Sequence, residues 1–227
     1  IFWQVESSLI PGGSGWTAEG DGTEYYLEPY DPSLIAFSRF ASDGSSNIYS
    51  MRPDGSGLTN LTHNKFFNRY PDWSPQAEKI VFASSEKIER SNVDLFVINA
   101  DGSGLTRLTD NPATDSFPEW SPHGTRIVFQ SDRLNAEIFV VNPDGSGEIN
   151  LSNNSAEDSL PHWSPDGMRI VFTSKRDGNG EVYVMSYAGS EQSNLTGSPG
   201  TDEFPGWSPD GVKIVFAASS ETPAPKS

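Results

Sequence analysis

The sequence predicts an all-β fold, a five-bladed β-propeller built from four-stranded antiparallel blades. The first observation is a hairpin motif, P-x-W-S-P followed by I-V-F, which recurs at residues 71–84, 118–131, 161–174 and 205–218. The second is its period, because the tryptophans of the motif recur every 43 to 47 residues, at Trp73, Trp120, Trp163 and Trp207. A period of about 40–45 residues is typical of a four-stranded propeller blade. Five such units account for most of the 227 residues.

Each unit has the pattern of four short strands. The hairpin motif supplies the first two, the third is an apolar segment such as DLFVIN (94–99), and the fourth is a short polar segment such as LTRLT (105–109). The second and third strands are apolar on both faces, as expected where neighbouring blades stack. D-G-S-G supplies glycine for the tight turn between strands three and four. A degenerate fifth copy lies upstream, around the segment IAF (35–37).

The repeats also predict where the blades begin and how the ring closes. We place the blades near residues 25–62, 68–109, 115–152, 158–196 and 202–218, in one domain over 1–218, followed by a Pro-rich tail or linker at 219–227. The last unit supplies only two strands, which leaves a strand edge without a partner. Residues 1–18 contain the apolar run IFWQV and the sequence PGGSG, which echoes PDGSG at 53–57. We therefore expect residues 1–18 to complete the last blade. The same strand could instead be donated to a neighbouring subunit, giving self-association.

Composition excludes several classes of partner. Acidic residues outnumber basic ones by 31 to 15, for a net charge of −16, which repels nucleic acid and anionic lipid. No apolar run approaches the roughly 20 residues of a membrane-spanning helix, so membrane insertion is not expected. The chain has no cysteine, which excludes disulfides, thiolate metal sites and a thiol nucleophile.

The repeat, complete at Asp158 to Thr196, resembles the WD40-like repeat of TolB-type β-propellers. The resemblance extends over about residues 25–218. It implies a propeller that binds protein or peptide partners in the periplasm, although similar repeats also occur in non-catalytic propellers of some peptidases and in distant pectate-type lyases. TolB-type propellers have six blades after an α/β domain, whereas this chain has repeats for five and lacks that domain. Partner-binding residues therefore cannot be transferred from the family.

The residues give no sign of an active site. His63, His123 and His162 occupy different places in their repeats, so the symmetry of a propeller would not gather them at one centre. The chain contains neither a G-x-S-x-G elbow nor an H-E-x-x-H motif. We expect the protein not to be an enzyme.

A carboxylate recurs five residues before the tryptophan, in Asp115, Asp158 and Asp202, with Asn68 at the matching place in the second blade. Side chains at the start of the innermost strands could converge at the channel, where calcium is the natural cation for several carboxylates. The interpretation we favour is intrablade ion pairing, because folding the hairpin brings Asp115 opposite Arg133 and Asp158 opposite Arg176. In the second blade both members have changed together, to Asn68 and Glu86.

A basic residue precedes each I-V-F segment, and these residues are Lys79, Arg126, Arg169 and Lys213. Such a rim could bind an acidic peptide or a carboxylate. The simpler interpretation is that these side chains neutralise turn aspartates such as Asp166 and Asp210. In the corresponding turn of the second blade Ala77 replaces glycine, and we expect that turn to take another shape.

The sequence predicts a non-catalytic binding or scaffold propeller that recognises a protein or peptide partner, in the periplasm, outside the cell or at the cell surface. Four N-glycosylation sequons, at Asn60, Asn150, Asn153 and Asn194, give weak support to a location outside the cytoplasm. The first alternative is a self-assembling extracellular or surface structural protein with N-terminal strand exchange. The second is a glycan-binding or lyase-type propeller.

Overall fold

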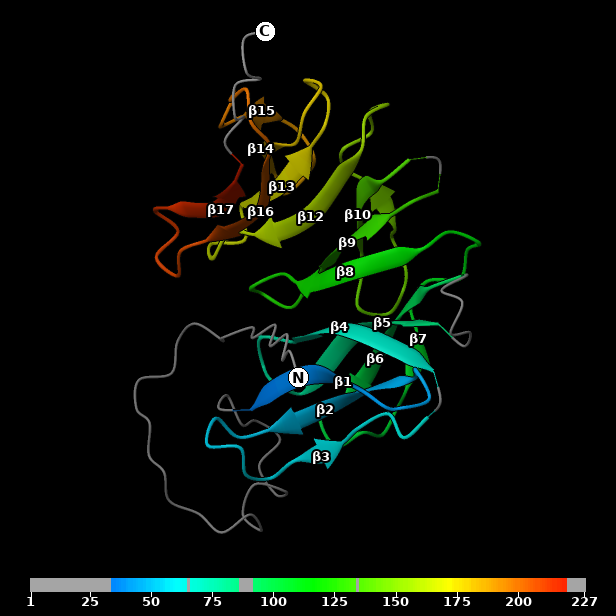
Figure 1. Cartoon of the computed structure of the whole chain (residues 1–227). Coiled ribbons are helices and arrows are strands. Elements are labelled where there is room, and N and C mark those ends of the chain that lie inside the picture. The colour runs from blue at the N-terminus through cyan, green and yellow to red at the C-terminus, as the bar shows by residue number, and fades with distance from the viewer. Residues whose placement is uncertain (1–33, 65, 86–91, 134, 220–227) are drawn as a thin grey trace, which may run out of the picture.

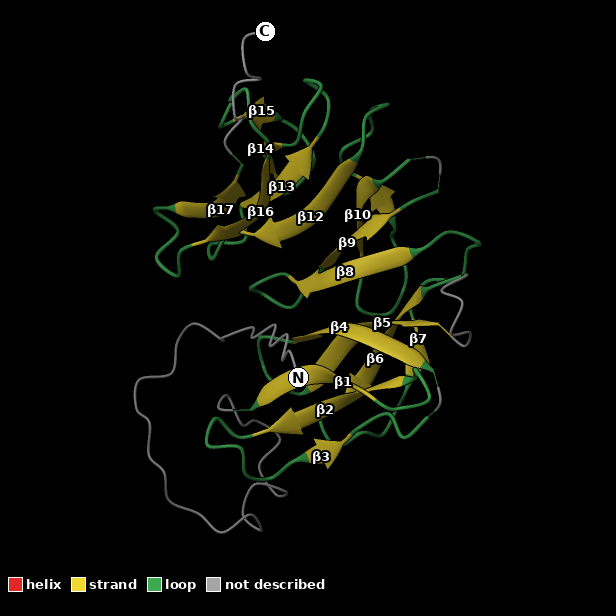
Figure 2. Cartoon of the chain, in the orientation of Figure 1, coloured by secondary structure: helices red, strands yellow, loops and turns green. Residues whose placement is uncertain are grey.

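The computed structural model describes residues 34–64, 66–85, 92–133 and 135–219 (Figure 1). Every regular element within these residues is a β-strand (Figure 2). The predicted all-β class is therefore confirmed. Among the same residues, no helix has the length and apolar character needed to cross a membrane.

The strands follow the predicted repeat, one group for each blade. The first group comprises β1 (Ile35–Phe40), β2 (Ser46–Met51) and β3 (Thr59–Asn60). The second comprises β4 (Phe67–Trp73), β5 (Lys79–Ser85), β6 (Asp94–Asn99) and β7 (Thr106–Arg107). The third comprises β8 (Asp115–Trp120), β9 (Ile127–Ser131), β10 (Glu137–Val141) and β11 (Ile149–Asn150). The fourth comprises β12 (Asp158–Trp163), β13 (Arg169–Ser174), β14 (Glu181–Ser186) and β15 (Ser193–Asn194), and the last comprises β16 (Asp202–Trp207) and β17 (Ile214–Ala218).

Strands that follow one another in the chain pair antiparallel within a blade. The orders are β4-β5-β6-β7, β8-β9-β10-β11 and β12-β13-β14-β15. The first two blades also touch through their backbones, because β2 and β4 form one parallel bridge between Ser46 and Phe67. The fourth strands contain only two residues each, which fits their polar sequence at an outer edge.

The turn between the first two strands has one shape in all four hairpins, and the expectation for Ala77 was wrong. Ala77 has a φ of +51°, in the same left-handed region as Gly124, Gly167 and Gly211 at +68° to +69°. Its N–H donates to the carbonyl of Ser74 at 2.8 Å, as the glycines do to their own serines. The Ala77 side chain is buried with Trp73 and Ile80. This burial offsets the strain of about 1–2 kcal/mol that a side chain incurs in that region.

The hydrophobic core lies between blades. One cluster joins Val81 and Leu95 of the second blade to Trp120 of the third, and another joins Val128 of the third blade to Trp163 of the fourth. The repeated tryptophan therefore packs its first strand onto the preceding blade. Figure 1 shows the blades following one another in a row, from β1 to β3 at one end to β16 and β17 at the other.

The described residues form no closed ring. The sheet at the end of the row has only two strands, β16 and β17. Residues 1–18, which we expect to complete it, lie outside the described residues, as do residues 220–227 of the tail.

Candidate functional site

The first strands carry a repeated irregularity that sequence reasoning missed. In β4, β8, β12 and β16 the register of pairing with the second strand shifts at a β-bulge. A large apolar residue occupies this bulge in each of these four strands, three positions before the tryptophan. These residues are Tyr70, Phe117, Leu160 and Phe204, and we call them the inner row. Their φ angles are +54°, +52°, +54° and +56° respectively.

The inner row is conformationally strained. A bulky side chain in the left-handed region is an outlier that costs on the order of 1–2 kcal/mol. A proline follows each of the four residues, and its ring disfavours the ordinary helical conformation of the residue before it. Strain that the surrounding structure imposes on large side chains is a pointer to a binding role.

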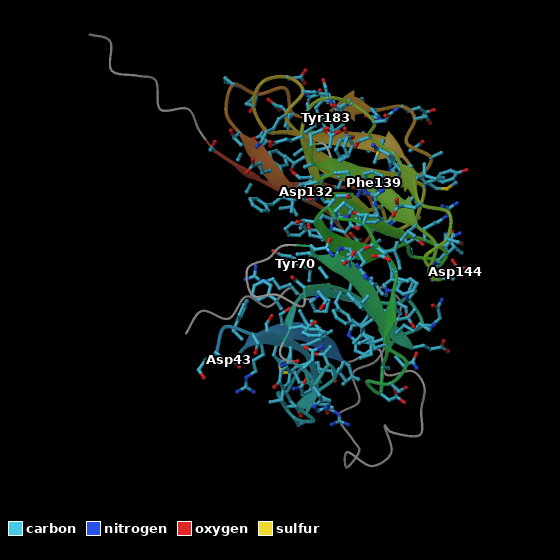
Figure 3. All side chains as sticks on the ribbon, turned by 90° about the vertical axis from the view of Figure 1, so that its right-hand side faces the viewer. Asp43, Tyr70, Asp132, Phe139, Asp144 and Tyr183 are labelled. Atoms are coloured by element: carbon cyan, nitrogen blue, oxygen red, sulfur yellow. The ribbon has the colours of Figure 1, made fainter. Side chains whose placement is uncertain are left out.

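The inner row continues from blade to blade. β4 contacts β8, β8 contacts β12, and β12 contacts β16. The rings of Tyr70 and Phe117, from neighbouring blades, have centroids 4.2 Å apart. Phe204 is 62% exposed, and in Figure 3 Tyr70 lies on the opposite side of the blades from Asp144 of an outer turn. The row is thus a partly exposed apolar strip of the kind that a protein partner covers.

Removing the side chain of Phe204 is expected to leave stability almost unchanged. Phe204→Gly relieves strain of about 1–2 kcal/mol. It loses little buried area, and glycine adds about 0.5–1 kcal/mol of unfolded-state entropy. Urea unfolding should give a free energy within about 1 kcal/mol of the parent. Met168→Gly is the control, because Met168 is 58% exposed and has no positive φ. A much larger loss for Phe204→Gly would show that this residue serves the fold.

Asp72, Glu119 and His162, each immediately before a repeated tryptophan, link neighbouring blades. The Trp120 N–H donates to Asp72 Oδ2 at 2.7 Å, and the Trp163 N–H donates to Glu119 Oε1 at 3.3 Å. His162 Nδ1 lies 2.9 Å from Glu119 Oε2. These bonds fix the first strands beside one another, so the inner row sits on a rigid base.

The aspartates five residues before the tryptophan are buried structural residues. Asp115, Asp158 and Asp202 each lie at the start of a first strand. The two expected ion pairs are present, with Arg176 Nη2 3.0 Å from Asp158 Oδ2 and Arg133 Nη2 4.0 Å from Asp115 Oδ2. Burial raises the pKa of both carboxyls above the usual aspartate range, against the opposing influence of neighbouring donors and arginines.

The residue four positions earlier also bonds to this place in each of the second to fifth blades. Asn111 donates to Asp115 at 2.7 Å, Asn154 to Asp158, and Ser198 to Asp202 at 2.9 Å. In the second blade Asn68 donates to Asn64 at 2.7 Å and accepts from Ser84 at 2.7 Å. The repeated position therefore ties the first strand to the loop that enters the blade. Glu86 lies outside the described residues.

No shared metal site emerges from these positions. Within the parts of the chain that the structure describes, no three His, Asp or Glu side chains come close enough to hold one ion. Asp115, Asp158 and Asp202 instead bond within their own blades, and His162 contacts Glu119. Calcium binding by the three aspartates stays a prediction, which metal analysis of the purified protein would test.

A second set of buried carboxylates went unnoticed in the sequence. Asp94, Glu137 and Glu181 begin the third strands and are almost fully buried. Ser152 Oγ donates to Glu137, and Thr196 Oγ1 donates to Glu181. The backbone N–H groups of Asn154 and Ser198 donate to the same two carboxylates, at 3.2 Å each. These acids hold the loop that leads to the next blade. In the sequence they could have been found from the pattern N-x-D or N-x-E, which occurs at the start of each of these three strands.

These contacts explain why sequons repeat. Asn194 Oδ1 accepts the N–H groups of Thr196 at 2.9 Å and Gly197 at 3.0 Å, while the Thr196 hydroxyl donates to Glu181. Asn60 accepts equivalently from Thr62 at 3.2 Å. Both sequon residues thus have structural roles, and these roles explain why the sequons recur at one position without any need for a glycan.

The four basic residues lie on separate blades, with Lys79 and Arg169 at the first position of a second strand and Arg126 and Lys213 immediately before one. Arg126 Nη1 lies 3.5 Å from the carbonyl of Gly147, and the Arg169 guanidinium lies 4.9 Å from the ring centroid of Trp207 in the next blade. Lys79 and Lys213 are exposed. Hydrogen bonds from Ser164 and the Met168 N–H hold the pKa of Asp166 low, with a smaller contribution from Arg169. Acidic-peptide binding at this rim stays a prediction.

The repeated antiparallel strand groups and the packing between them define the class as β-propeller repeat proteins. The family model of the TolB beta propeller domain matches residues 31–146 and 134–224. The chain belongs to the TolB β-propeller family, which confirms the predicted resemblance. No curated protein sequence matches the chain.

Solved structures show the same fold. A TolB protein of Agrobacterium tumefaciens matches with a TM-score of 0.69 and 26% identity, over 84% of this chain and 72% of that one. TolB of Acinetobacter baumannii matches with a TM-score of 0.71 and 21% identity, over 84% of this chain and 48% of that one. An oligogalacturonate lyase in complex with manganese matches with a TM-score of 0.65 and 14% identity, over 82% and 59%. The lyase shares the fold alone.

Proposed function

We propose that the chain is a non-catalytic binding propeller that recognises a protein or peptide partner through the inner row. The observation that carries the proposal is the left-handed conformation of four bulky residues at one repeated position, with Phe204 largely exposed. Large apolar side chains on a rigid base supply contact area at little cost in conformational entropy. Membership of the TolB family supports a binding or scaffold role.

The proposal includes a closed five-bladed ring that works outside the cytoplasm, in the periplasm or at the cell surface. The regular succession of blades supports the ring, and the similarity to TolB proteins supports the location. Self-association through the N-terminal strand remains the alternative arrangement. Light scattering before and after deletion of residues 1–18 separates the two, because loss of a large assembly indicates strand exchange and a monomer that becomes less stable indicates closure in one chain.

The inner row should bind apolar peptides. Selection of displayed peptides on the immobilised chain is expected to yield binders that lose at least tenfold affinity for Phe204→Gly and keep it for Met168→Gly. Both variants are expected to fold, so the comparison reports on the contact itself. Binders that tolerate Phe204→Gly equally well, or no binders, would contradict a role for the inner row.

The lyase alternative makes a different prediction. An enzyme of that kind should release products from oligogalacturonate in the presence of manganese, and a glycan-binding module should retain labelled oligosaccharides. We expect neither from this chain, since the described residues gather no set of histidine and acidic side chains around one point. Product formation would overturn the non-catalytic proposal directly.

A further inference from the structure

Arg69 lies among aromatic rings at the junction of the first two blades, where β1 packs beside β4 (Figure 1). Its guanidinium carbon is 4.2 Å from the ring centroid of Phe67, 4.9 Å from that of Phe40 and 6.0 Å from that of Tyr70. The rings of Phe40 and Phe67 are also in contact, with centroids 5.8 Å apart. A cation is attracted to the face of each ring, so these contacts hold the guanidinium in one place. We call Arg69 and these three aromatic residues the Arg69 cluster.

The arginine is an exception to the repeat. Arg69 immediately precedes Tyr70 of the inner row, and the residues at the same position of the next three blades are Ser116, Ser159 and Glu203. Those three blades form the same first strand with the same bulge. The blade therefore does not require an arginine at this position, and a role for Arg69 has to be sought in what its side chain can bind.

Two other arginines show how a guanidinium on an aromatic ring is completed in this protein. Arg176 lies 4.5 Å from the ring centroid of Tyr183 and pairs with Asp158 at 3.0 Å. Arg133 lies 4.4 Å from the centroid of another ring and pairs with Glu148. In both cases the ring contacts the flat face of the guanidinium, while the N–H groups at its edge remain available for a carboxylate.

Arg69 has the rings without the carboxylate. Among the described residues, no acidic side chain pairs with it. The position beside it, which carries aspartate in the next three blades, holds Asn68. The described part of the chain thus contains an oriented guanidinium without an anion, although the whole molecule has a net charge of −16.

We propose that Arg69 binds a carboxylate of the partner and so selects peptides that carry an acidic group beside an apolar side chain. This inference rests on the proposed function, because it names the chemistry recognised at the Tyr70 end of the inner row. Phe40 is 54% exposed, and Arg69 and Tyr70 are partly exposed, so a ligand can reach the cluster. A guanidinium that the rings already orient loses little freedom when it forms a bidentate pair. A C-terminal carboxylate and an acidic side chain present the same two oxygens to it.

Small probes test the site on the full chain by NMR titration. N-acetylphenylalanine combines a ring with a terminal carboxylate, and the amide of acetyl-aspartyl-phenylalanine combines a ring with a side-chain carboxylate. Each has a neutral counterpart, the amide of N-acetylphenylalanine and the amide of acetyl-asparaginyl-phenylalanine. At least one acid should bind about tenfold more tightly than its neutral counterpart, and the acid with the larger preference identifies the source of the carboxylate. A parent chain that shows no preference for either acid would overturn the proposal.

Substitution of Arg69 tests whether the preference arises at this residue. Arg69→Gln should abolish it, whereas Arg39→Gln should retain it. Arg39 is the matched control, because it is exposed and its guanidinium lies 5.5 Å from the ring centroid of Tyr49. Arg69→Lys keeps the charge but loses the planar fork, so the preference should fall severalfold in a chain of unchanged net charge. Full preference in Arg69→Gln or in Arg69→Lys would contradict recognition by the guanidinium.

The same probes separate this inference from the proposed function. Phe204 lies at the other end of the inner row, so Phe204→Gly should leave the preference for the small acids unchanged while it weakens the displayed peptides. If the acid preference depends on Arg69 but displayed peptides tolerate Phe204→Gly, the carboxylate site stands and the inner row fails as a peptide site. If displayed peptides require Phe204 but the parent chain shows no acid preference, the proposed function stands and the carboxylate site is wrong.

Discussion

Gly145→Val should lower the free energy of unfolding by about 3 kcal/mol or more, the sum of a conformational and a steric cost. Gly145 has a φ of +83°, which a β-branched residue adopts only under strain. Its Cβ would also stand 2.9 Å from the carbonyl oxygen of Leu108, so one blade would have to move away from the next. Because the hydrophobic core lies between blades, this separation weakens packing along the whole junction.

Gly178→Val separates the two costs. Gly178 has a φ of +104°, and a Cβ there would meet nothing within 4 Å. The strain alone should therefore lower its free energy of unfolding by about 1–2 kcal/mol. Urea unfolding of both variants, with the slope compared to confirm that the unfolded states are alike, measures the difference. Equal losses would show that contact between the turn and the carbonyl contributes nothing to the junction.

The sequence predicted the blades well because one repeated pattern encodes them. Period, apolar segments and turn glycines all agree on the same strands, and each copy supports the others. The prediction failed at Ala77, because the usual preference for glycine in this turn was given more weight than the repeated pattern. Burial of the methyl group between Trp73 and Ile80 decides that turn, and burial cannot be deduced from a single position in the sequence.

The candidate site was predicted only in part. Spacing was enough to pair Asp158 with Arg176, because the hairpin register follows from the turn. The inner row was missed since neither a β-bulge nor a positive φ is visible in residue types. Its signal was the combination of a large apolar residue and a proline at one place in each first strand, as in Phe117 and Pro118. Glu181 was missed because an acidic residue before an apolar strand is ordinarily solvated.

Two buried carboxylates should respond to acid in opposite directions. Glu181 is 1% exposed. Burial raises its pKa, but hydrogen bonds from Thr196, the Ser198 N–H and Asn179 outweigh this effect and hold the pKa below the usual glutamate range. Its contribution to stability is therefore present above the ordinary glutamate pKa and is lost as pH falls through the folded value. At pH 7, Glu181→Gln should lower the free energy of unfolding by about 2–3 kcal/mol.

The contribution of Asp158 to stability should depend on pH in the opposite way, because burial raises its pKa in the folded state despite the neighbouring Ser174 and Arg176. Its charged form costs stability at neutral pH, and that cost disappears as pH falls through the folded pKa to the ordinary aspartate value. Urea unfolding from pH 7 to pH 3 should show the gap between the parent and Glu181→Gln closing as pH falls. The parent should gain relative to Asp158→Asn over the same range, and Asn68 shows that asparagine fits this position. If the parent instead gained stability relative to Glu181→Gln as pH falls, the hydrogen bonds to Glu181 would not outweigh its burial, and the loop to the fifth blade would be held by packing.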